Sequence, residues 1–363
     1  IAYGILGGIA GAAAAAGPLI GGWVTTEFSW RWVFAAETII ILLVILPLTA
    51  KVRDGERKAI SGRFDFLGVA LSALAMGLVV LALVTANTWG LVKPIDPPFE
   101  VFGFSPVIPI VLVGLVIARL FFAWERHVET TGRSPLIGTD LLRIRSLRSG
   151  LGSMLVLYFT IAGTFFILPL YLQTVLGLNA FESGVRILPM SIAIFVMALV
   201  GSRLGTRFSP RLLVQLGLGT ATAGVLLLIG AITPDARGTL FGVAMGIIGL
   251  GLGLAVSQIG NINLSAAKDT RSSEIGGLQG TAQNLGSSLG VAIAGTVLFI
   301  GLATTFTGNL SNQPAATAEL QQAAAEAVSD GVQVVPASQV KAATEAAGLP
   351  PDEVDAVVDS YSE

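Results

Sequence analysis

The sequence has no cysteine, one histidine (His127) and few charged side chains. Without cysteine the chain forms neither disulfide bonds nor thiolate metal sites, and cysteine usage says nothing about the redox compartment. Charged residues make up 12% of the 363 positions, whereas an ordinary soluble domain carries about 25%. Hydrophobic residues reach 53%, and the mean hydropathy is +0.79. This composition indicates an integral membrane protein.

Signatures of common enzymes are missing as well. The sequence contains no P-loop, no H-E-x-x-H and no cluster of Cys and His. The stretch GLGLGL, from Gly249 to Leu254, has a glycine spacing close to that of a dinucleotide loop, but it lies inside a hydrophobic run with no strand before it. We therefore attribute these glycines to helix packing. We expect no enzyme activity, no metal or other cofactor, and no nucleic-acid partner.

Long apolar runs dominate the chain. A membrane-spanning helix needs about 20 mostly apolar residues, and the sequence holds about nine such runs. They cover residues 2–24, 32–48, 66–86, 106–124, 150–172, 184–204, 212–232, 240–262 and 277–303. We predict an all-α integral membrane protein with about nine transmembrane helices surrounded by membrane lipid.

Lysine and arginine concentrate in alternate loops. Residues 51–63 and 125–149 are rich in both, whereas the loops of opposite parity carry only Arg31, Lys93, Arg186 and Arg237. Basic loops stay on the cytoplasmic side of a membrane. We therefore expect a multi-pass protein of the plasma (inner) membrane, with residue 1 near the cytoplasmic side and residues 305–363 outside.

The last stretch of the chain differs from the rest. Residues 305–363 are acidic, with Lys341 as the only basic residue, and helix starts are predicted at Thr317, Ser338 and Pro351. We interpret this stretch as short helices in an extracytoplasmic loop. Both ends of the chain look cut, since residue 1 already lies within an apolar run, so we expect a piece of a longer membrane protein.

The first apolar run carries glycines and a proline in an unusual arrangement. In YGILGGIAGAAAAAGPLIGG, small residues repeat every four positions, as in Gly17/Gly21, and Pro18 removes one backbone hydrogen bond. Such a helix face lets another helix approach backbone to backbone. The residues alone leave open whether this is a static packing seam or a seam that slides.

The same stretch resembles the antiporter signature of the major facilitator superfamily. Ala13 stands where that pattern has Gly; the matching residues are Gly4, Gly17, Pro18, Gly21 and Gly22. In the family this signature lies on the fifth helix and marks exporters that exchange substrate against protons. The resemblance therefore implies a proton gradient as the energy source and a small-molecule substrate.

The rest of the chain resembles the fourteen-helix drug:proton antiporter branch of that superfamily. The resemblance is carried by FSWRWVFAAE, FDFLGVALSALAMGLVVLAL, LPLYLQTVLGLNAFESGVRILP and GLQGTAQNLGSSLGVAIAGTVL. It implies a partial major-facilitator bundle that runs from helix five to the outer loop before helix fourteen, and a monomer. The implied parts are residues 1–49 (last two helices of the N-terminal bundle), 50–65 (cytoplasmic loop), 66–124 (two inserted linker helices), 125–149 (cytoplasmic loop), 150–304 (five helices of the C-terminal bundle) and 305–363 (acidic extracytoplasmic loop).

One acid stands inside a predicted span. Glu37 lies about six residues into a run that is otherwise filled by Val, Phe, Ala, Thr, Ile and Leu. An intramembrane acid costs a few kcal/mol near the centre of a membrane and is a functional hypothesis by default. We consider two interpretations, a proton-coupling residue and an acid near the outer headgroups that pairs with Arg31 or meets water.

Other polar residues are candidates for function. Neutral polar groups inside the spans either hold helices together or line a cavity; they are Tyr158, Thr160, Thr164, Gln279, Gln283 and Asn284. SRLGTRFSPR is similar to the family's short cytoplasmic signature, with Leu204, Arg207 and Arg211 matching, although Thr206 replaces its acid. A plain positive loop and a charge relay are both considered for it.

The leading hypothesis is a secondary transporter that exports small lipophilic or cationic compounds by alternating access while protons enter. Two alternatives remain open. One is a non-transporting receptor or scaffold with an extracytoplasmic binding tail, and the other is a major facilitator carrier that takes up solutes.

Overall fold

The computed structural model describes residues 2–51, 65–94, 97–131, 135–138, 140–231, 239–266, 271–314, 316–329 and 337–362. Residues 52–64, with most of the first predicted basic loop, lie outside this part of the chain, as do Arg133, Arg237 and Lys268. The described residues form thirteen α-helices and no named strand. The all-helical fold class is thereby confirmed.

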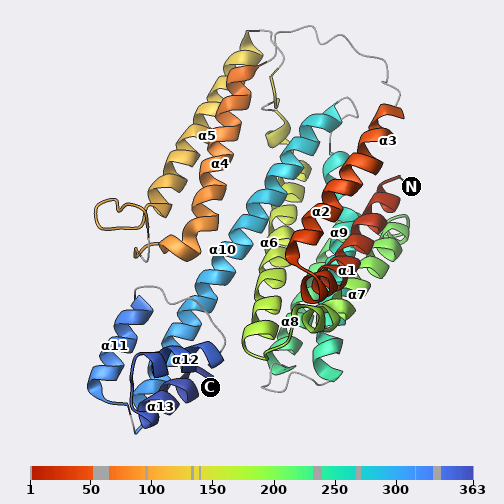
Figure 1. Cartoon of the computed structure of the whole chain (residues 1–363). Helices are drawn as coiled ribbons and strands as arrows, with labels where there is room; N and C mark the ends of the chain where they lie inside the picture. The colour runs from red at the N-terminus through yellow and green to blue at the C-terminus, as the bar shows by residue number, and fades with distance from the viewer. Residues whose placement is uncertain are drawn as a thin grey trace. The chain divides into compact units, whose positions relative to one another are not determined.

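The helices follow the predicted spans (Figure 1). Their bounds are α1 (Ala2–Glu27), α2 (Trp30–Ile40), which continues through the π-helical turn η1 (Ile41–Ile45) into α3 (Leu46–Lys51), α4 (Phe66–Trp89), α5 (Val107–Thr130), the short 3₁₀ turn η2 (Leu141–Arg143), α6 (Arg145–Thr174), α7 (Ala180–Leu204), α8 (Pro210–Ala231), α9 (Thr239–Leu264) and α10 (Ser272–Asn312). Among the described residues, seven helical segments, α2 to α3 and α4 to α9, are long and apolar enough to cross a membrane. α1 and α10 coincide with the first and last predicted spans.

Two helices extend further than their apolar runs. α5 continues to Thr130 and α10 to Asn312, whereas the sequence predicted loops from residues 125 and 305. The end of an apolar run marks where a helix leaves hydrocarbon, not where its backbone hydrogen bonds stop. In α5 the extra turn is supported by burial, because Glu125 and Val128 are 0% and 3% exposed.

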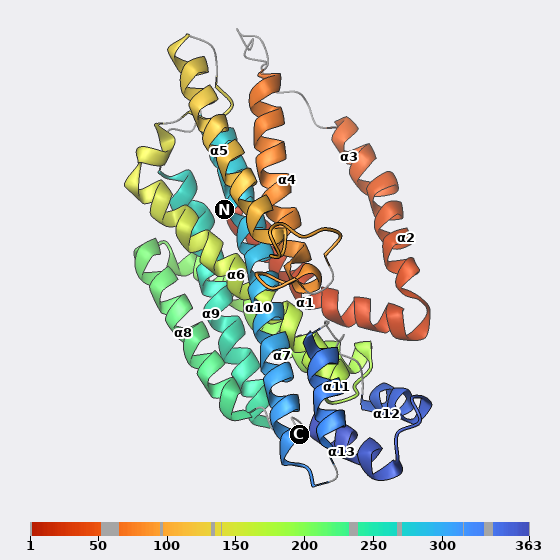
Figure 2. The same ribbon diagram turned by 90° about the vertical axis from the view of Figure 1, so that its left-hand side faces the viewer.

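The chain divides into two compact units. Unit one comprises residues 1–69, 123–153 and 178–279, and unit two comprises residues 70–122, 154–177 and 280–363. Within unit one, α9 packs against both α7 and α8, and α1 packs against α7. Figure 2 shows α8 and α9 side by side along their length.

The glycines of α9 explain how three helices meet so closely. Gly249 and Gly253 lie against the backbone of α7, where a Cβ atom on Gly253 would be 2.5 Å from the backbone oxygen of Ile194. Gly251, between them, lies against α8, where a Cβ atom would be 2.8 Å from the Cα of Ala221. The packing interpretation of GLGLGL is thus confirmed, with alternate glycines serving opposite neighbours.

We predict that Gly251→Ala destabilises unit one by about 1–3 kcal/mol, the usual cost of overpacking a core. The added methyl group meets backbone atoms of α8, which cannot rotate away as a flexible side chain does. Gly246→Ala on the same helix is the control, because nothing lies within 4 Å of its Cβ position. Thermal unfolding of the purified protein should separate the two variants, and equal melting temperatures would contradict the packing.

Unit two contains a similar seam between α6 and α10. Cβ atoms on Gly286 and Gly290 would collide with the backbone oxygens of Leu155 and Phe159, and one on Gly163 would lie 3.3 Å from the backbone oxygen of Gly290. A second core joins α4, α5 and α10; its buried members are Ala82, Leu83, Ala86, Val107 and Ala292.

The acidic tail forms three short helices, as predicted. They are α11 (Ala318–Ser329), α12 (Ala337–Ala346) and α13 (Pro351–Ser362). Thr317 caps α11, because its Oγ1 accepts from the N–H of Leu320 at 3.3 Å and also bonds Glu353 of α13 at 3.2 Å. Thr317 thereby links the start of α11 to α13.

Candidate functional site

α1 and α7 touch backbone to backbone. A Cβ atom on Gly22 of α1 would lie 2.5 Å from the backbone oxygen of Ala180 and 3.0 Å from the Cα of Phe181. A Cβ atom on Gly184 of α7 would lie 2.5 Å from the backbone oxygen of Pro18. At both points a hydrogen atom stands where any other residue has a side chain, which is the condition for close helix approach in a membrane. We call this contact the α1–α7 seam.

The predicted signature residues lie on two sides of α1. Gly22 is buried and Pro18 is half-buried, and both belong to the seam. Gly17 and Gly21 have no atom within 4 Å of their Cβ positions, so their side of the helix is open in the part of the chain that the structure describes. Gly4 lies within α1, and its packing is outside the described residues. The contact thus repeats at Pro18 and Gly22, not at the Gly17/Gly21 pair.

Glu37 lies in α2 with an exposed side chain. Its backbone oxygen accepts from the N–H of Ile41, where the helix widens into the π-helical turn Ile41–Ile45. Single π-helical turns occur frequently at functional sites. Arg31, the partner considered from the sequence, lies over the Trp30 ring with its Cζ 5.3 Å from the ring centroid.

The six neutral polar candidates have different environments. Gln279 joins two helices, because its Nε2 donates to the backbone oxygen of Gly260 on α9 at 3.3 Å. Thr160 and Asn284 donate to carbonyls of their own helices, each at 2.9 Å. The other three are half-buried: Tyr158, Thr164 and Gln283. Gln279 therefore holds helices together, and a cavity-lining role for the six stays a prediction.

The connection from α7 to α8 carries the basic motif. Leu204 is half-buried at the end of α7, whereas Arg207 and Arg211 are exposed. Gln258 of α9 closes this end of unit one, since its buried Nε2 donates to the backbone oxygen of Gly201 at 2.7 Å. A charge relay needs a partner for each arginine, and the exposure of both favours a plain basic loop.

Sequence reasoning did not find a charged cluster at the start of α10, which we call the Arg271 latch (Gly138, Asp140, Arg271 and Glu274). Arg271 binds Glu274 with two hydrogen bonds, Nε to Oε1 at 3.0 Å and Nη2 to Oε2 at 2.9 Å, and it reaches Asp140 Oδ2 at 2.6 Å. The backbone N–H of Gly138 donates to Glu274 Oε2 at 2.8 Å. Such bidentate, charge-assisted bonds are among the strongest in proteins. Arg271 thereby ties the loop before α6 to α10.

The latch sets the ionisation of its own acids. The hydrogen bond from Arg271 holds the pKa of Asp140 below its ordinary value of 3.8. Burial alone would raise the pKa of Glu274, but bonds from Arg271 and the Gly138 amide outweigh it and lower that pKa below 4.5. A lowered folded-state pKa gives stability that is complete above the unfolded pKa and lost as the pH falls through the folded one.

We therefore predict that the melting temperature drops on acidification below about pH 4. Arg271→Gln should remove most of the stability that is lost in this acidic range. The variant should be less stable than the parent at neutral pH and should depend less steeply on acid. Arg143→Gln, which changes an exposed arginine in η2, serves as the control for loss of one positive charge. Parallel pH profiles for all three proteins would show that the latch adds no stability.

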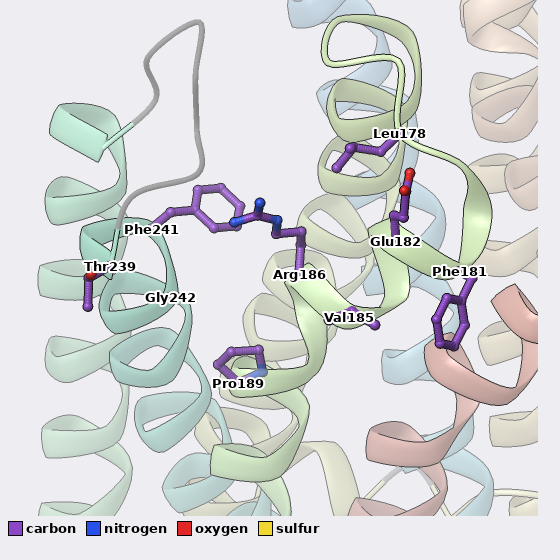
Figure 3. A pocket seen from close by; sticks show the side chains of 9 residues that line it. All are labelled: Leu178, Phe181, Glu182, Val185, Arg186, Pro189, Thr239, Phe241 and Gly242. Carbon is purple, nitrogen blue, oxygen red and sulfur yellow. The ribbon is translucent and has the colours of Figure 1, made fainter.

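A cavity of about 660 Å³ lies in unit one at the start of α7 and of α9 (Figure 3). Glu182 is committed to the cap of α7, where its carboxylate accepts from the N–H of Asn179 at 2.9 Å. Arg186 is half-buried, and its side chain reaches from α7 toward Phe241 of α9 in Figure 3. The lining residues are Leu178, Phe181, Glu182, Val185, Arg186, Pro189, Thr239, Phe241 and Gly242.

The sequence profile of the Major Facilitator Superfamily matches residues 1–291. The chain belongs to the major facilitator superfamily. Members of this superfamily are membrane transporters and not enzymes, and the family assignment agrees with the resemblance found in the sequence. The match covers α1 to α9 and the first half of α10, and it includes the α1–α7 seam and the Arg271 latch.

Several curated relatives of this facilitator are drug-resistance or export proteins. The tetracenomycin C resistance and export protein of Streptomyces glaucescens is 30% identical over 304 residues, which are 82% of this chain and 52% of the relative. The probable actinorhodin transporter of Streptomyces coelicolor is 29% identical over 309 residues, 83% of this chain and 51% of the relative. The puromycin resistance protein of Streptomyces alboniger is 29% identical over 325 residues, which are 88% of this chain and 60% of the relative. The chain thus spans about half the length of the first two relatives.

Proposed function

We propose that this facilitator chain is part of a proton-coupled exporter of small lipophilic or cationic compounds, of the fourteen-helix drug:proton antiporter branch. The observation that carries the proposal is the α1–α7 seam. Its signature residues Pro18 and Gly22 lie against a glycine and an alanine of another helix with no side chains between them. Helices that meet through bare backbone have no interlocking side chains to withdraw, so a small shift along the seam meets few obstacles.

The names of the relatives support export over uptake. One of the three described above is named a resistance and export protein and another a resistance protein, and resistance by a transporter requires outward movement. Proton coupling is proposed for Glu37, the acid inside an apolar span beside a π-helical turn. Neutral polar side chains of α6 and α10, among them Tyr158 and Gln283, are proposed to face the substrate pathway.

The proposed orientation follows the Lys/Arg bias, with residue 1 near the cytoplasm and the acidic tail outside the plasma membrane. The exporter is proposed to act as a monomer. Two contacts of the tail, the bond from Thr317 to Glu353 of α13 and the packing of Tyr361 on Phe306 of α10, stay within unit two, and neither favours the receptor or scaffold alternative.

The test is accumulation of ethidium, a lipophilic cation, in cells that express the full-length transporter. We expect lower ethidium inside these cells than in cells with an empty vector, and loss of the difference when a protonophore collapses the proton gradient. Higher ethidium in the expressing cells would favour the uptake carrier. If a broad panel of lipophilic and cationic compounds showed no difference at all, the exporter proposal would fail.

A further inference from the structure

A pair of carboxyl groups lies within unit one where α4 begins and α5 ends. Asp65 precedes α4, and Glu125 lies near the end of α5. Glu125 is 0% exposed, although acidic side chains are almost never fully buried without a partner. Neither the α1–α7 seam, the Arg271 latch nor the cavity accounts for this burial.

The hydrogen-bond donors around Glu125 can be assigned to its two oxygens. Oε2 accepts from the backbone N–H groups of Leu136 at 2.7 Å and Ile137 at 3.3 Å. Oε1 is buried and has no hydrogen-bond partner among the residues that the structure describes. A buried carboxylate oxygen without a donor costs the full desolvation of a charged group.

Asp65 shows the complementary arrangement. Its Oδ1 accepts from Trp124 Nε1 and from the N–H of Gly68, both at 2.9 Å. Oδ2 receives only the longer contact from Trp124, at 3.1 Å. A Cβ atom on Gly68 would collide with Asp65 Oδ2 and lie 2.6 Å from Glu125 Oε1. Glu125 Oε1, which lacks a donor, and Asp65 Oδ2, which has only the longer bond from Trp124, therefore approach the same point over Gly68.

We propose that Asp65 and Glu125 bind one proton between Oδ2 and Oε1 and that this proton holds residues 135–138 against α5. One proton supplies the single donor that the arrangement lacks, and two facing carboxyl groups share a proton because like charges at contact cannot both ionise. A hard cation such as Mg²⁺ or Ca²⁺ needs six or more oxygen ligands. Among the described residues no third His, Cys, Asp or Glu joins the pair to make such a site.

The other charged groups of α5 and of the latch that the structure describes are exposed or bonded to one another. On α5, Arg126, His127 and Glu129 are exposed. Across the loop, Asp140, Arg271 and Glu274 bind one another in the latch. No described cation bonds to Glu125 Oε1, so a proton is the positive charge that fits there.

The proton site connects to α10 through the loop. Leu136 and Ile137 bond to Glu125, and the next residue, Gly138, bonds to Glu274 of the latch. Loss of the proton leaves two negative charges face to face, one of them buried, which drives the carboxyl groups apart and releases the Leu136 and Ile137 amides. Proton occupancy at the end of α5 thus controls the loop that reaches α10, on the side that the Lys/Arg bias predicts to face the cytoplasm. This role does not depend on drug export.

The test uses the full-length transporter in lipid nanodiscs. Infrared difference spectra should show a protonated carboxyl band at neutral pH that Glu125→Gln and Asp65→Asn each remove. Glu129→Gln, an exposed acid on the same helix, should leave the band in place. Hydrogen exchange at Leu136 and Ile137 adds a second readout. If the loop opens only when the pair releases its proton, the equilibrium constant for opening rises about tenfold per pH unit in the range where the pair titrates. The exchange rates of the two amides, corrected for the intrinsic exchange rate, should rise by the same factor.

Glutamine at position 125 carries its own N–H donor, so Glu125→Gln should keep these amides protected at every pH and abolish the pH dependence. Two results would overturn the proposal. One is a spectrum at neutral pH in which neither Glu125→Gln nor Asp65→Asn removes a carboxyl band. The other is an identical pH dependence of exchange in the parent and in Glu125→Gln. The infrared test also applies to Asp65→Asn alone if Glu125→Gln fails to fold.

Discussion

Replacing Gly22 by alanine is expected to reduce export by the full-length transporter roughly ten- to hundredfold. The new methyl group would lie 2.5 Å from the backbone oxygen of Ala180, and no rotation of a side chain relieves that contact. Overpacking of this kind costs about 1–3 kcal/mol. The cost arises only in the conformation that closes the α1–α7 seam. It therefore shifts the equilibrium away from that conformation by roughly the ten- to hundredfold expected for export. The measurement is the initial rate of ethidium efflux, normalised to the amount of folded transporter.

Gly21→Ala is the matched control, one position away on the same helix with nothing within 4 Å of its Cβ position. It should export at nearly the parental rate. Gly184→Ala approaches the seam from α7 and should resemble Gly22→Ala. The double variant should cost less than the sum of the two single costs, because residues in one contact are coupled. Parental rates in both Gly22→Ala and Gly184→Ala would separate the seam from transport.

Replacing Glu37 by glutamine is expected to abolish proton-driven accumulation while leaving movement down a substrate gradient. An acid within an apolar span gains and loses a proton, whereas the glutamine amide does not. With one proton exchanged per monovalent substrate, a difference of one pH unit supports about a tenfold concentration ratio. In inside-out vesicles the ratio of substrate concentration inside to outside should be about ten for the parent and about one for Glu37→Gln.

Glu27→Gln provides the comparison, since Glu27 is an exposed acid at the end of α1. It should accumulate substrate as the parent does. Accumulation by Glu37→Gln at the parental ratio would assign proton coupling to another residue, and loss of downhill movement as well would indicate a structural role for Glu37.

The helices were predictable because each apolar run is long enough to need one, and a helix is the local structure that satisfies its backbone in hydrocarbon. The GLGLGL stretch shows what such reasoning provides. Its position inside an apolar run predicted packing, but only the structure assigns Gly251 to α8 and its two neighbours to α7. A fixed four-residue spacing gives one face of a helix, whereas a helix between two partners uses both.

The α1–α7 seam was predictable in kind but not in register. The sequence pointed to small residues in the first span, yet the contacting positions are Pro18 and Gly22, because a proline contributes a bare backbone oxygen without being small. The Arg271 latch and the Asp65–Glu125 pair were not predicted. Arg271 and Asp140 of the latch lie 131 residues apart in the chain, and Asp65 and Glu125 lie about 60 residues apart. Each looks like an ordinary loop charge until folding brings the partners together.

The most direct test of the proposed exchange is a measurement of proton movement by the purified full-length transporter in proteoliposomes that enclose a pH-sensitive dye. An imposed inward gradient of ethidium, with no initial pH difference, should move protons outward in the parent and produce no pH change in Glu37→Gln. Ethidium entry without any pH change in the parent would contradict proton-coupled antiport and leave a facilitator that moves its substrate without protons.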